Sequence, residues 1–486
     1  MRLSELLREV EFEGSIKNDF DIKFVTDDSR LVRPGALFVC IRHRSFDGHT
    51  AAAEALASGA AAVVTQERLG LENELNVADS RAAYARLCAA LCGHPERKLR
   101  MIGVTGTNGK TTVTTLIRNI LSDSGIKTLL TGTVCNRLGE ESLPSGLTTP
   151  KPPELYSLLS RAVLSGCEAC VAEASSQALA QGRLEGIAFD AAVFTNITRD
   201  HLDYHGTFEN YLAAKKKLFE HSEVSAVNLD DPRADEIIAA SSGKTVTFST
   251  VLDCADYTAK NISLLPEGVS FELVSKGRIE HINFASPGLF SVSNAMAAAV
   301  CAINLGVDPR SAAQSLARSK GVCGRLERVE CGTPYSVIID YAHTPDGLEQ
   351  VLRALRPSCR GKLIVLFGCG GDRDKTKRPL MGAVACKYAD TVIVTSDNPR
   401  SEEPMKIIGD ILKGTDKKRR GLFIEEDRRR ATALALSLAK PGDTVLLAGK
   451  GHEKYQLICG EKLPLDERET VREILGLPHD TGRKKP

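Results

Sequence analysis

The chain has no tryptophan, aromatic side chains at only 5% of its 486 positions, and almost no net charge, because 63 basic residues stand against 62 acidic ones. This balance gives no indication of a nucleic-acid or membrane-surface partner. No apolar run approaches the roughly 18 residues of a membrane-spanning helix, and the charged, amphipathic residues 1–14 do not form a secretory signal. We therefore expect no nucleic-acid partner and no membrane insertion. The length predicts two to four domains with sizeable cores.

The fourteen cysteines follow no repeated spacing. Cys167 and Cys170 form a lone C-x-x-C pair, but no second pair follows to complete a zinc site. Cys88 and Cys92 lie within a helical Ala/Leu run, which indicates core packing. Reduced thiols of a cytoplasmic protein account for nearly all of them, and a cytoplasmic location is our expectation.

Residues 100–112, RMIGVTGTNGKTT, combine a buried strand, a glycine turn and the start of a helix. The glycines would let backbone N–H groups approach a polyphosphate, and the helix N-terminus adds partial positive charge. Lys110 can reach the β- and γ-phosphates, and the Thr111 hydroxyl can hold Mg²⁺. Strict P-loop spacing asks for glycine where this chain has Val104, so the generic pattern is only partly met. The alternative is an ordinary strand–turn–helix connection, but the combination favours a nucleotide site.

Short apolar strands alternate with helices along the chain, which is typical of parallel α/β sheets. A break signal at Gly93-His94-Pro95 closes the first region, and the P-loop strand opens the second. The second region continues into a more β-rich stretch at residues 245–284, and the third begins near Arg325 with further buried strands. The pattern predicts an α/β fold with three domains: 1–98, 99–324 with a mostly parallel sheet, and 325–486.

Polar residues follow several strands of the second region. Glu173 stands at the end of a strand, where ligands of open α/β sheets bind, and a carboxylate there suits Mg²⁺ beside a nucleotide. A solvated loop glutamate is the alternative. Residues 195–206, TNITRDHLDYHG, carry two aspartates and two histidines that could coordinate a metal or organise phosphates. The run Lys215-Lys216-Lys217, taken by itself, is typical of a solvated charged surface.

Four strand ends in the third region carry glycines or charged groups: residues 340–345, 368–374, 397–400 and 449–453. Any one of them alone could be a turn, but four that converge on one sheet edge predict a binding surface. Arg373 and Arg400 are suited to a bidentate grip on a carboxylate. Asp397, Asn398 and Glu453 are suited to an ammonium group. Together they predict an amino-acid-like substrate.

These motifs resemble those of the Mur ligases, in order and at family-like spacing over almost the full chain. The segments that carry the resemblance are GTNGKTT (106–112), EASSQAL (173–179), TNITRDHLDYHG (195–206), YLAAK (211–215), GRLERV (324–329), DYAHTPD (340–346) and AGKGHE (448–453). The resemblance is strongest to the members that add the third residue of the peptidoglycan stem peptide. The motif Asp397-Asn398-Pro399-Arg400 is similar to the version selective for meso-diaminopimelate over lysine, because an arginine can read the extra carboxylate.

The resemblance implies a UDP-binding N-terminal domain, a central P-loop ATPase domain and a Rossmann-like C-terminal domain. It implies a monomer that uses ATP and Mg²⁺ to join meso-diaminopimelate to the D-glutamyl carboxylate of UDP-N-acetylmuramoyl-L-alanyl-D-glutamate. The activated species would be an acyl phosphate, and the product a peptidoglycan precursor.

The resemblance also implies roles by position. ATP would be bound by Gly106, Thr107, Asn108, Gly109, Lys110, Thr111, Thr112, Asn294, Arg325 and Asp340. The UDP-muramyl dipeptide would be bound by Ser29, His43, Arg44, Ser45, Thr148, Thr149, Ser175, Gln181 and Arg183. Diaminopimelate would be bound by Arg373, Asp397, Asn398, Pro399, Arg400, Gly449 and Glu453. Catalytic residues would be Lys110, Glu173, His201, Lys215, Arg325 and His343, and Mg²⁺ would be held by Thr111, Glu173, His201 and Lys215.

In this assignment Lys215 would be carbamylated to N6-carboxylysine, an anionic bridge to a second Mg²⁺, which reverses the interpretation of the lysine run as a solvated surface. Two other functions stay open. One is a sister ligase, such as a lysine-adding enzyme or folylpolyglutamate synthase, which the 397–400 motif and the long N-terminal region argue against. The other is a nucleotide-binding switch or motor without ligase activity, which leaves the predicted amino-acid pocket unused.

Overall fold

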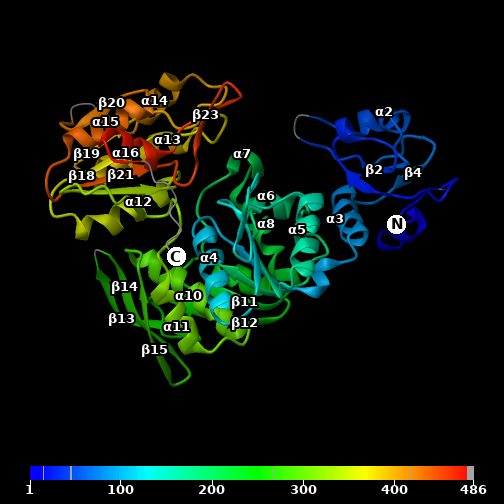
Figure 1. Ribbon diagram of the computed structural model, residues 1–486, viewed down its shortest axis with the longest axis horizontal. Coiled ribbons are helices and arrows are strands. Elements are labelled where there is room, and N and C mark those ends of the chain that lie inside the picture. The colour runs from blue at the N-terminus through cyan, green and yellow to red at the C-terminus, as the bar shows by residue number, and fades with distance from the viewer. Residues whose placement is uncertain (15, 44–45, 266, 417–418, 479–486) are drawn as a thin grey trace.

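The computed structural model shows three α/β units that follow one another along the chain (Figure 1). It describes residues 1–478 except residues 15, 44–45, 266 and 417–418, and residues 479–486 lie outside the described part. Arg44 and Ser45, two of the predicted UDP-binding residues, are therefore outside the described residues. The expected α/β class and mostly parallel sheets are confirmed.

The N-terminal unit is built on a four-stranded parallel sheet in the order β1-β2-β3-β4. Its strands are β1 (Phe24–Thr26), β2 (Ala36–Val39), β3 (Ala62–Thr65) and β4 (Glu74–Asn76), and its helices are α1 (Leu3–Leu6), α2 (Ala52–Ala57) and α3 (Ser80–Leu91). All four residues of β2 and of β3 are buried, as the apolar runs predict. Helix α3 also packs against α5 (Pro152–Leu164), so the first and second units share a hydrophobic core.

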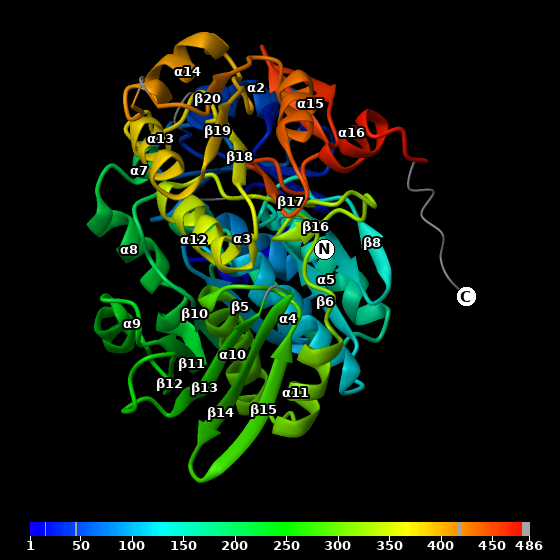
Figure 2. The same cartoon turned by 90° about the vertical axis from the view of Figure 1, so that its left-hand side faces the viewer.

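The central unit contains an eleven-stranded sheet in the order β15-β14-β13-β12-β11-β10-β5-β9-β6-β7-β8. Strands β6, β9, β5, β10, β11, β12 and β13 run parallel, and antiparallel hairpins extend both edges. The strands are β5 (Arg100–Thr105), β6 (Thr128–Thr131), β7 (Asn136–Leu138), β8 (Glu141–Leu143), β9 (Ala169–Glu173), β10 (Phe189–Phe194), β11 (Ser222–Asn228), β12 (Lys244–Ser249), β13 (Tyr257–Leu265), β14 (Gly268–Ser275) and β15 (Arg278–Phe284). Figure 2 shows β13, β14 and β15 projecting as a ribbon at the far end of this unit.

Two hydrophobic cores cover the two faces of this sheet. Met101 of β5 belongs to the core shared with α3 and α5, and Ile102 and Val104 belong to the core under α4, α10 and α11. Burial on both faces explains why the strand reads as a continuous apolar run. The remaining helices are α4 (Lys110–Asp123), α6 (Ser176–Ala180), α7 (Leu202–His205), α8 (Phe208–Lys216), α9 (Ala234–Ala240), α10 (Leu289–Asn304) and α11 (Pro309–Arg318).

The C-terminal unit has a six-stranded sheet in the order β16-β17-β21-β18-β19-β20, parallel except for β16. The strands are β16 (Glu327–Arg328), β17 (Ser336–Asp340), β18 (Leu363–Phe367), β19 (Thr391–Val394), β20 (Leu422–Ile424) and β21 (Thr444–Ala448). Helices α12 (Pro345–Leu355), α13 (Lys377–Tyr388) and α14 (Pro404–Leu412) cover one face, and α15 (Arg428–Leu438) and α16 (Glu467–Ile474) cover the other. A separate hairpin is formed by β22 (Tyr455–Ile458) and β23 (Glu461–Pro464).

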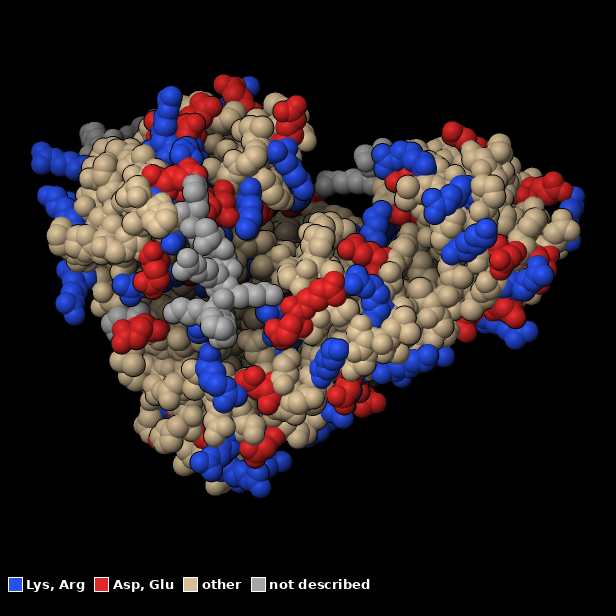
Figure 3. All heavy atoms as spheres, in the orientation of Figure 1, with Lys and Arg blue, Asp and Glu red and all other residues tan. Residues whose placement is uncertain are grey.

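The C-terminal and N-terminal units form two lobes on the central unit, and the molecule is notched between them (Figure 3). On the face shown, lysine and arginine side chains alternate with aspartate and glutamate, without a patch of one sign. This agrees with the balanced composition. Among the described residues, no helix combines the length and the apolar character needed to cross a bilayer.

Candidate active site

A cavity of about 1000 Å³ joins the P-loop of the central unit to the strand ends of the C-terminal unit. Most of the residues predicted for ATP, for the dipeptide and for the amino acid line it, so the structure brings the three predicted subsites together. Gly106, Gln181 and Pro399 are not among its lining residues, and neither are Ser29 and His43 of the N-terminal unit.

The P-loop glycines are required by their surroundings. Gly106 has φ +155°, and a Cβ there would lie 1.9 Å from Thr195 Oγ1. Gly109 has φ +89°, and its Cβ would lie 2.5 Å from Asn294 Oδ1. Gly109 is also the N-cap of α4 and supplies no capping side chain, so the first N–H groups of the helix remain available to an anion. Val104, the departure from the strict motif, is fully buried within β5, before the turn.

The lysine of the loop is held by the loop itself. Lys110 Nζ donates to the carbonyls of Gly106 and Thr107, at 2.8 and 2.9 Å. Burial lowers the pKa of Lys110, although the nearby charges of Glu173 and Asp200 oppose the shift. The amine is therefore at the loop, where a phosphate would meet the helix N-terminus.

Glu173 and Thr111 form a pair of oxygen donors beside this lysine. Thr111 Oγ1 donates to Glu173 Oε2 at 3.1 Å, and Thr133 donates to the same carboxylate through its N–H and its hydroxyl, each at 2.8 Å. Glu173 is only 1% exposed at the end of β9, so the alternative of a solvated loop residue is wrong. Carboxylate and hydroxyl oxygens fit a hard cation such as Mg²⁺. No group of three or more His, Cys, Asp and Glu side chains with metal-binding geometry occurs among the described residues.

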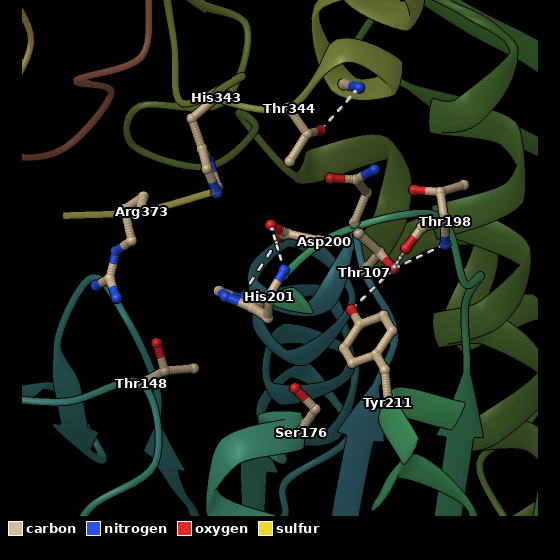
Figure 4. A network of polar contacts seen from close by, with 12 residues as sticks. Thr107, Thr148, Ser176, Thr198, Asp200, His201, Tyr211, His343, Thr344 and Arg373 are labelled. Carbon is tan, nitrogen blue, oxygen red and sulfur yellow. Dashed lines mark hydrogen bonds and ion pairs between the residues drawn. The ribbon is translucent and has the colours of Figure 1, made fainter. Parts of the chain in front are cut away.

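His201 and its neighbours form the side of the cavity shown in Figure 4. His201 has φ +53°, and its Nε2 lies 3.4 Å from Asp200 Oδ2. Burial lowers the pKa of His201 to about 4, so the ring is neutral near pH 7 and can act as a metal ligand. The cluster at 195–206 pointed to this site but did not single out Asp200, which is 8% exposed and lies between His201 and His343.

Lys215 lies on the inward face of α8, one helical turn after Tyr211. It is 1% exposed, and its Nζ donates to the same Gly106 carbonyl as Lys110, at 2.8 Å. Its Nζ also lies 4.6 Å from the centre of the Tyr211 ring. Burial, together with the charge of Lys110, lowers the pKa of Lys215 well below its usual range. The interpretation of this lysine as part of a solvated surface is therefore wrong, whereas Lys217 is exposed as expected.

The start of the C-terminal unit reaches back to the P-loop. Arg325 Nη2 donates to Thr111 Oγ1 at 3.1 Å, and the Arg325 guanidinium lies 4.6 Å from the centre of the Tyr341 ring. Asp340, at the end of β17, uses both carboxylate oxygens to accept the N–H groups of Leu326 and Ala342 at 2.7 Å each. Asp340 thus fixes the segment that carries Arg325.

The histidine predicted in the same unit, His343, is held by its own loop. Its Nδ1 lies 2.9 Å from the Tyr341 carbonyl, and its own carbonyl accepts Lys377 Nζ at 3.0 Å. Burial lowers the pKa of His343. A second bridge between the units runs from Asn108 Nδ2 to Asp346 Oδ2 at 3.0 Å.

The predicted amino-acid pocket is assembled from three strand ends. Asn398 Nδ2 donates to Glu453 Oε2 at 2.9 Å, and Arg400 Nη1 donates to the Gly371 carbonyl at 2.7 Å. Gly449, with φ +109°, brings its backbone next to Asp397. Asp397 Oδ1 is buried and has no hydrogen-bond partner among the described residues, and Lys450 Nζ lies 3.7 Å away as an ion-pair partner, so the oxygen keeps capacity to accept a hydrogen bond from a ligand.

Arg373 completes the pocket from the loop after β18, and it extends into the space flanked by His201, His343 and Thr148 (Figure 4). Sequence reasoning missed Lys450, which is fully buried and donates to Asn398 Oδ1 at 2.8 Å and Glu453 Oε2 at 2.7 Å. The sequence analysis includes its segment, residues 449–453, in the predicted binding surface but assigns no role to this lysine, and its place between two glycines was the available signal.

The residues predicted for the dipeptide lie next to Glu173. Thr149 Oγ1 donates to the Glu173 carbonyl at 2.6 Å and lies 3.1 Å from Ser175 Oγ. Arg183 Nη1 donates to the Thr149 carbonyl at 2.7 Å, and Arg183 is itself held by Gln181 Oε1. The Thr133 hydroxyl, which donates to Glu173, lies 3.1 Å from that of Thr148.

His43 of the N-terminal unit and Lys151, the N-cap of α5, both lie close to the carboxylate of Asp27. His43 Nε2 lies 3.4 Å from Asp27 Oδ2, and Lys151 Nζ lies 3.0 Å from the same oxygen. Ser29 opens a short 3₁₀ helix two residues after Asp27. These residues therefore stand where the N-terminal unit faces the beginning of α5.

Three sequence models match this chain in order: the Mur ligase family catalytic domain over residues 21–89, the Mur ligase middle domain over 104–302, and the Mur ligase glutamate ligase domain over 324–451. A UDP-N-acetylmuramoyl-L-alanyl-D-glutamate–2,6-diaminopimelate ligase of Syntrophomonas wolfei is 43% identical and covers 98% of this chain and 99% of its own. The chain belongs to the Mur ligase family. A relative of the same name from Caldanaerobacter subterraneus is 44% identical, again over 98% and 99% of the two chains.

Solved structures agree with this membership. A solved structure of a ligase with the same name as these relatives superposes with a TM-score of 0.70 at 34% identity, covering 98% of this chain and 99% of its own. The Mycobacterium tuberculosis folylpolyglutamate synthase superposes with a TM-score of 0.63 at 17% identity, over 82% and 95% of the two chains. At that identity the second likeness shows a shared fold only. The predicted resemblance to the Mur ligases is confirmed.

Proposed function

We propose that this Mur ligase uses ATP to join the amino group of meso-diaminopimelate to the D-glutamyl carboxylate of UDP-N-acetylmuramoyl-L-alanyl-D-glutamate. The relatives named above carry this activity in their names, which favours it over a lysine-adding enzyme and over a switch without ligase activity. The observation that carries the proposal is the single cavity shared by the P-loop, the Glu173 region and the Arg373–Arg400 pocket. A nucleotide switch would have no use for the Arg373–Arg400 pocket.

We assign the ATP polyphosphate to the turn and the helix N-terminus at 106–112. Lys110 would move from the two loop carbonyls to the phosphates, which offer a stronger, charged acceptor. Arg325 is close enough to Thr111 to approach the γ-phosphate. Asn294 borders Gly109 and is assigned to the nucleoside side, as is Asp340 through the segment that it fixes.

The donor set fits Mg²⁺, because Thr111 and Glu173 supply neighbouring oxygens and His201 supplies a neutral nitrogen. Bound there, Mg²⁺ would neutralise charge on the transferring phosphoryl group. Lys215 would add to carbon dioxide as a free amine, with formation of an N–C bond and loss of a proton. Its depressed pKa makes the free amine available, and the resulting carbamate would place an anion beside Lys110.

We assign the muramyl dipeptide to Thr148, Thr149, Ser175 and Arg183, with Gln181 holding the arginine in place. The UDP end is assigned to the N-terminal unit, at Ser29 and the loop from His43. The D-glutamyl carboxylate would then approach the P-loop from the Glu173 side. In the same scheme residues 1–98, 99–324 and 325–486 act as the UDP, ATP and amino-acid domains of a monomer that works in the cytoplasm.

The chemistry follows from this placement. The D-glutamyl carboxylate attacks the γ-phosphorus of ATP, the bond to the β-phosphate oxygen breaks, and ADP leaves an acyl phosphate. The uncharged amine of diaminopimelate attacks the acyl carbon, and the tetrahedral adduct loses phosphate and a proton to form the amide. The protein contributes position and charge neutralisation through Lys110, His201 and Arg325. His343 would help to orient the incoming amine from the wall that it shares with Arg373.

Oxygen transfer tests this scheme directly. The dipeptide substrate labelled with ¹⁸O in its D-glutamyl carboxylate is incubated with ATP, Mg²⁺ and meso-diaminopimelate. We expect one ¹⁸O atom in the released phosphate, together with a product whose mass corresponds to the diaminopimelate adduct. Unlabelled phosphate would contradict acyl phosphate formation, and release of phosphate without the adduct would favour a switch.

A further inference from the structure

Arg378 is an arginine without an assigned role, buried beneath the amino-acid pocket. It lies on α13 with a side chain only 1% exposed, and it grips both oxygens of Glu402: Nη2 to Oε1 at 2.8 Å and Nη1 to Oε2 at 3.1 Å. Nη1 also reaches Asp410 Oδ2 at 3.0 Å. Arg378 Nε is buried without a hydrogen-bond partner among the described residues, so the two carboxylates are what compensates the buried charge, and loss of either would be costly.

Glu402 connects Arg378 to the loop that carries Arg373. Its Oε1 accepts the N–H of Asp372 at 2.7 Å. Asp372, which has φ +54°, in turn accepts the N–H of Ser401 at 3.2 Å and the Ser401 hydroxyl at 2.7 Å. The hydrogen bond from Arg378 is the largest cause of a Glu402 pKa lowered to about 2, so the carboxylate stays ionised at working pH.

The two loops are packed too closely to move independently. Gly371 N–H donates to the Asn398 carbonyl at 2.9 Å, and a Cβ on Gly371 would lie 1.9 Å from the Pro399 carbonyl oxygen. Arg400 adopts φ +54°, and its backbone is paired with the β22 hairpin through Leu457 and Cys459 at 3.0 and 2.7 Å. The loops therefore behave as one body whose support is the Arg378–Glu402 pair.

We propose that Arg378 and Glu402 are positioning residues for amino-acid selection, which hold the loops of Arg373 and Arg400 at the separation that reads the distal carboxylate of a diamino-dicarboxylate. This inference rests on the proposed function and deepens it. Neither residue is among those that line the cavity, so both would act through Asp372 and through the segment after Arg400. The pair therefore affects binding of the amino acid and not phosphoryl transfer.

The test is Glu402→Gln, which preserves shape but places an amide where Arg378 needs a second acceptor. We expect the KM for meso-diaminopimelate to rise about tenfold or more, the loss that one strong charged hydrogen bond produces. The KM for ATP should stay within about twofold, because the P-loop is unaffected. The preference for meso-diaminopimelate over L-lysine should fall, because lysine lacks the carboxylate that the loops read. The proposal would be overturned if kcat/KM fell equally for meso-diaminopimelate and L-lysine, or if the KM for meso-diaminopimelate stayed unchanged.

Asp390→Asn is the matched control. Asp390 also accepts an arginine, Arg356, at 2.6 Å and a backbone N–H, that of Leu363, at 2.7 Å, but at the opposite ends of β18 and β19. We expect Asp390→Asn to leave unchanged the KM for meso-diaminopimelate, the KM for ATP and the preference for meso-diaminopimelate over L-lysine. If thermal unfolding shows that Glu402→Gln is not folded, Ser401→Ala serves as the test instead. This variant removes only the exposed hydrogen bond from the Ser401 hydroxyl to Asp372, and it should also raise the KM for meso-diaminopimelate. A wild-type protein that does not use diaminopimelate would refute the proposed function, whereas normal use with an unchanged KM in the variants would refute this inference alone.

Discussion

Replacing Lys215 with methionine should abolish turnover and yet stabilise the protein increasingly as the pH falls. In the folded chain the amine is 1% exposed, and its pKa is lowered well below the model-compound value of 10.5, mainly by burial and then by the charge of Lys110. In the unfolded chain the same amine is solvated and binds a proton below about 10.5. Protons therefore favour the unfolded state over the whole interval between the two pKa values.

The magnitude follows from linkage. Within that interval each unit of falling pH costs the folded state about 1.4 kcal/mol relative to the unfolded state, because one proton is bound on unfolding. The methionine variant lacks this cost, so its advantage over the wild type should grow as the pH falls from 9.5 to 7.5, by about 1.4 kcal/mol for each pH unit that lies above the folded-state pKa. For a unit of about 200 residues each such step corresponds to roughly 3–6 °C in the difference between unfolding temperatures.

Scanning calorimetry of both proteins at the two pH values measures this change. ATP and Mg²⁺ are omitted, and the buffer is kept free of bicarbonate so that carbamate does not form. Lys217 is an exposed residue of the same lysine run. For Lys217→Met, the difference in unfolding temperature from the wild type should not grow as the pH falls. If the difference in unfolding temperature between Lys215→Met and the wild type stays constant or shrinks as the pH falls, the argument that Lys215 is held as an uncharged amine is refuted.

Three further substitutions separate the subsites of the cavity. Lys110→Met should lower kcat at least about 100-fold, the effect of losing one preorganised charge at a developing anion, in a phosphate-release assay; retention of a tenth of the activity would contradict its role. Arg400→Lys should raise the diaminopimelate KM about tenfold, because a lysine cannot form the bidentate pair, while parallel changes in the ATP KM would argue against that assignment. Glu173→Gln should shift the Mg²⁺ concentration for half-maximal activity upward, measured by metal titration at saturating ATP, and an unshifted curve would remove Glu173 from the metal site.

The general position of the site could be predicted because it depends on topology. Carboxyl ends of parallel strands meet at one sheet edge, so residues 340–345, 368–374, 397–400 and 449–453 had to lie near one another once the strands were recognised. The structure places residues from all four segments along one cavity. The α/β class followed in the same way from apolar runs that alternate with helices.

Side-chain direction could not be predicted in the same way. Three consecutive lysines look alike in sequence, and only the packing of α8 selects Lys215 for the interior, on the same face as Tyr211. Lys450 was missed because its burial depends on two acceptors, Glu453 in its own loop and Asn398 in the loop after β19, and the sequence does not show that these loops meet.

The central claim is tested most directly by phosphate release from ATP and Mg²⁺ with UDP-N-acetylmuramoyl-L-alanyl-D-glutamate, with meso-diaminopimelate compared against L-lysine. We expect release that requires the dipeptide and strongly favours diaminopimelate, because Arg373 and Arg400 line the cavity and are the residues to which we assign its second carboxylate. A preference for lysine would keep the ligase activity but contradict the specificity. Release that is indifferent to both amino acids would contradict the ligase.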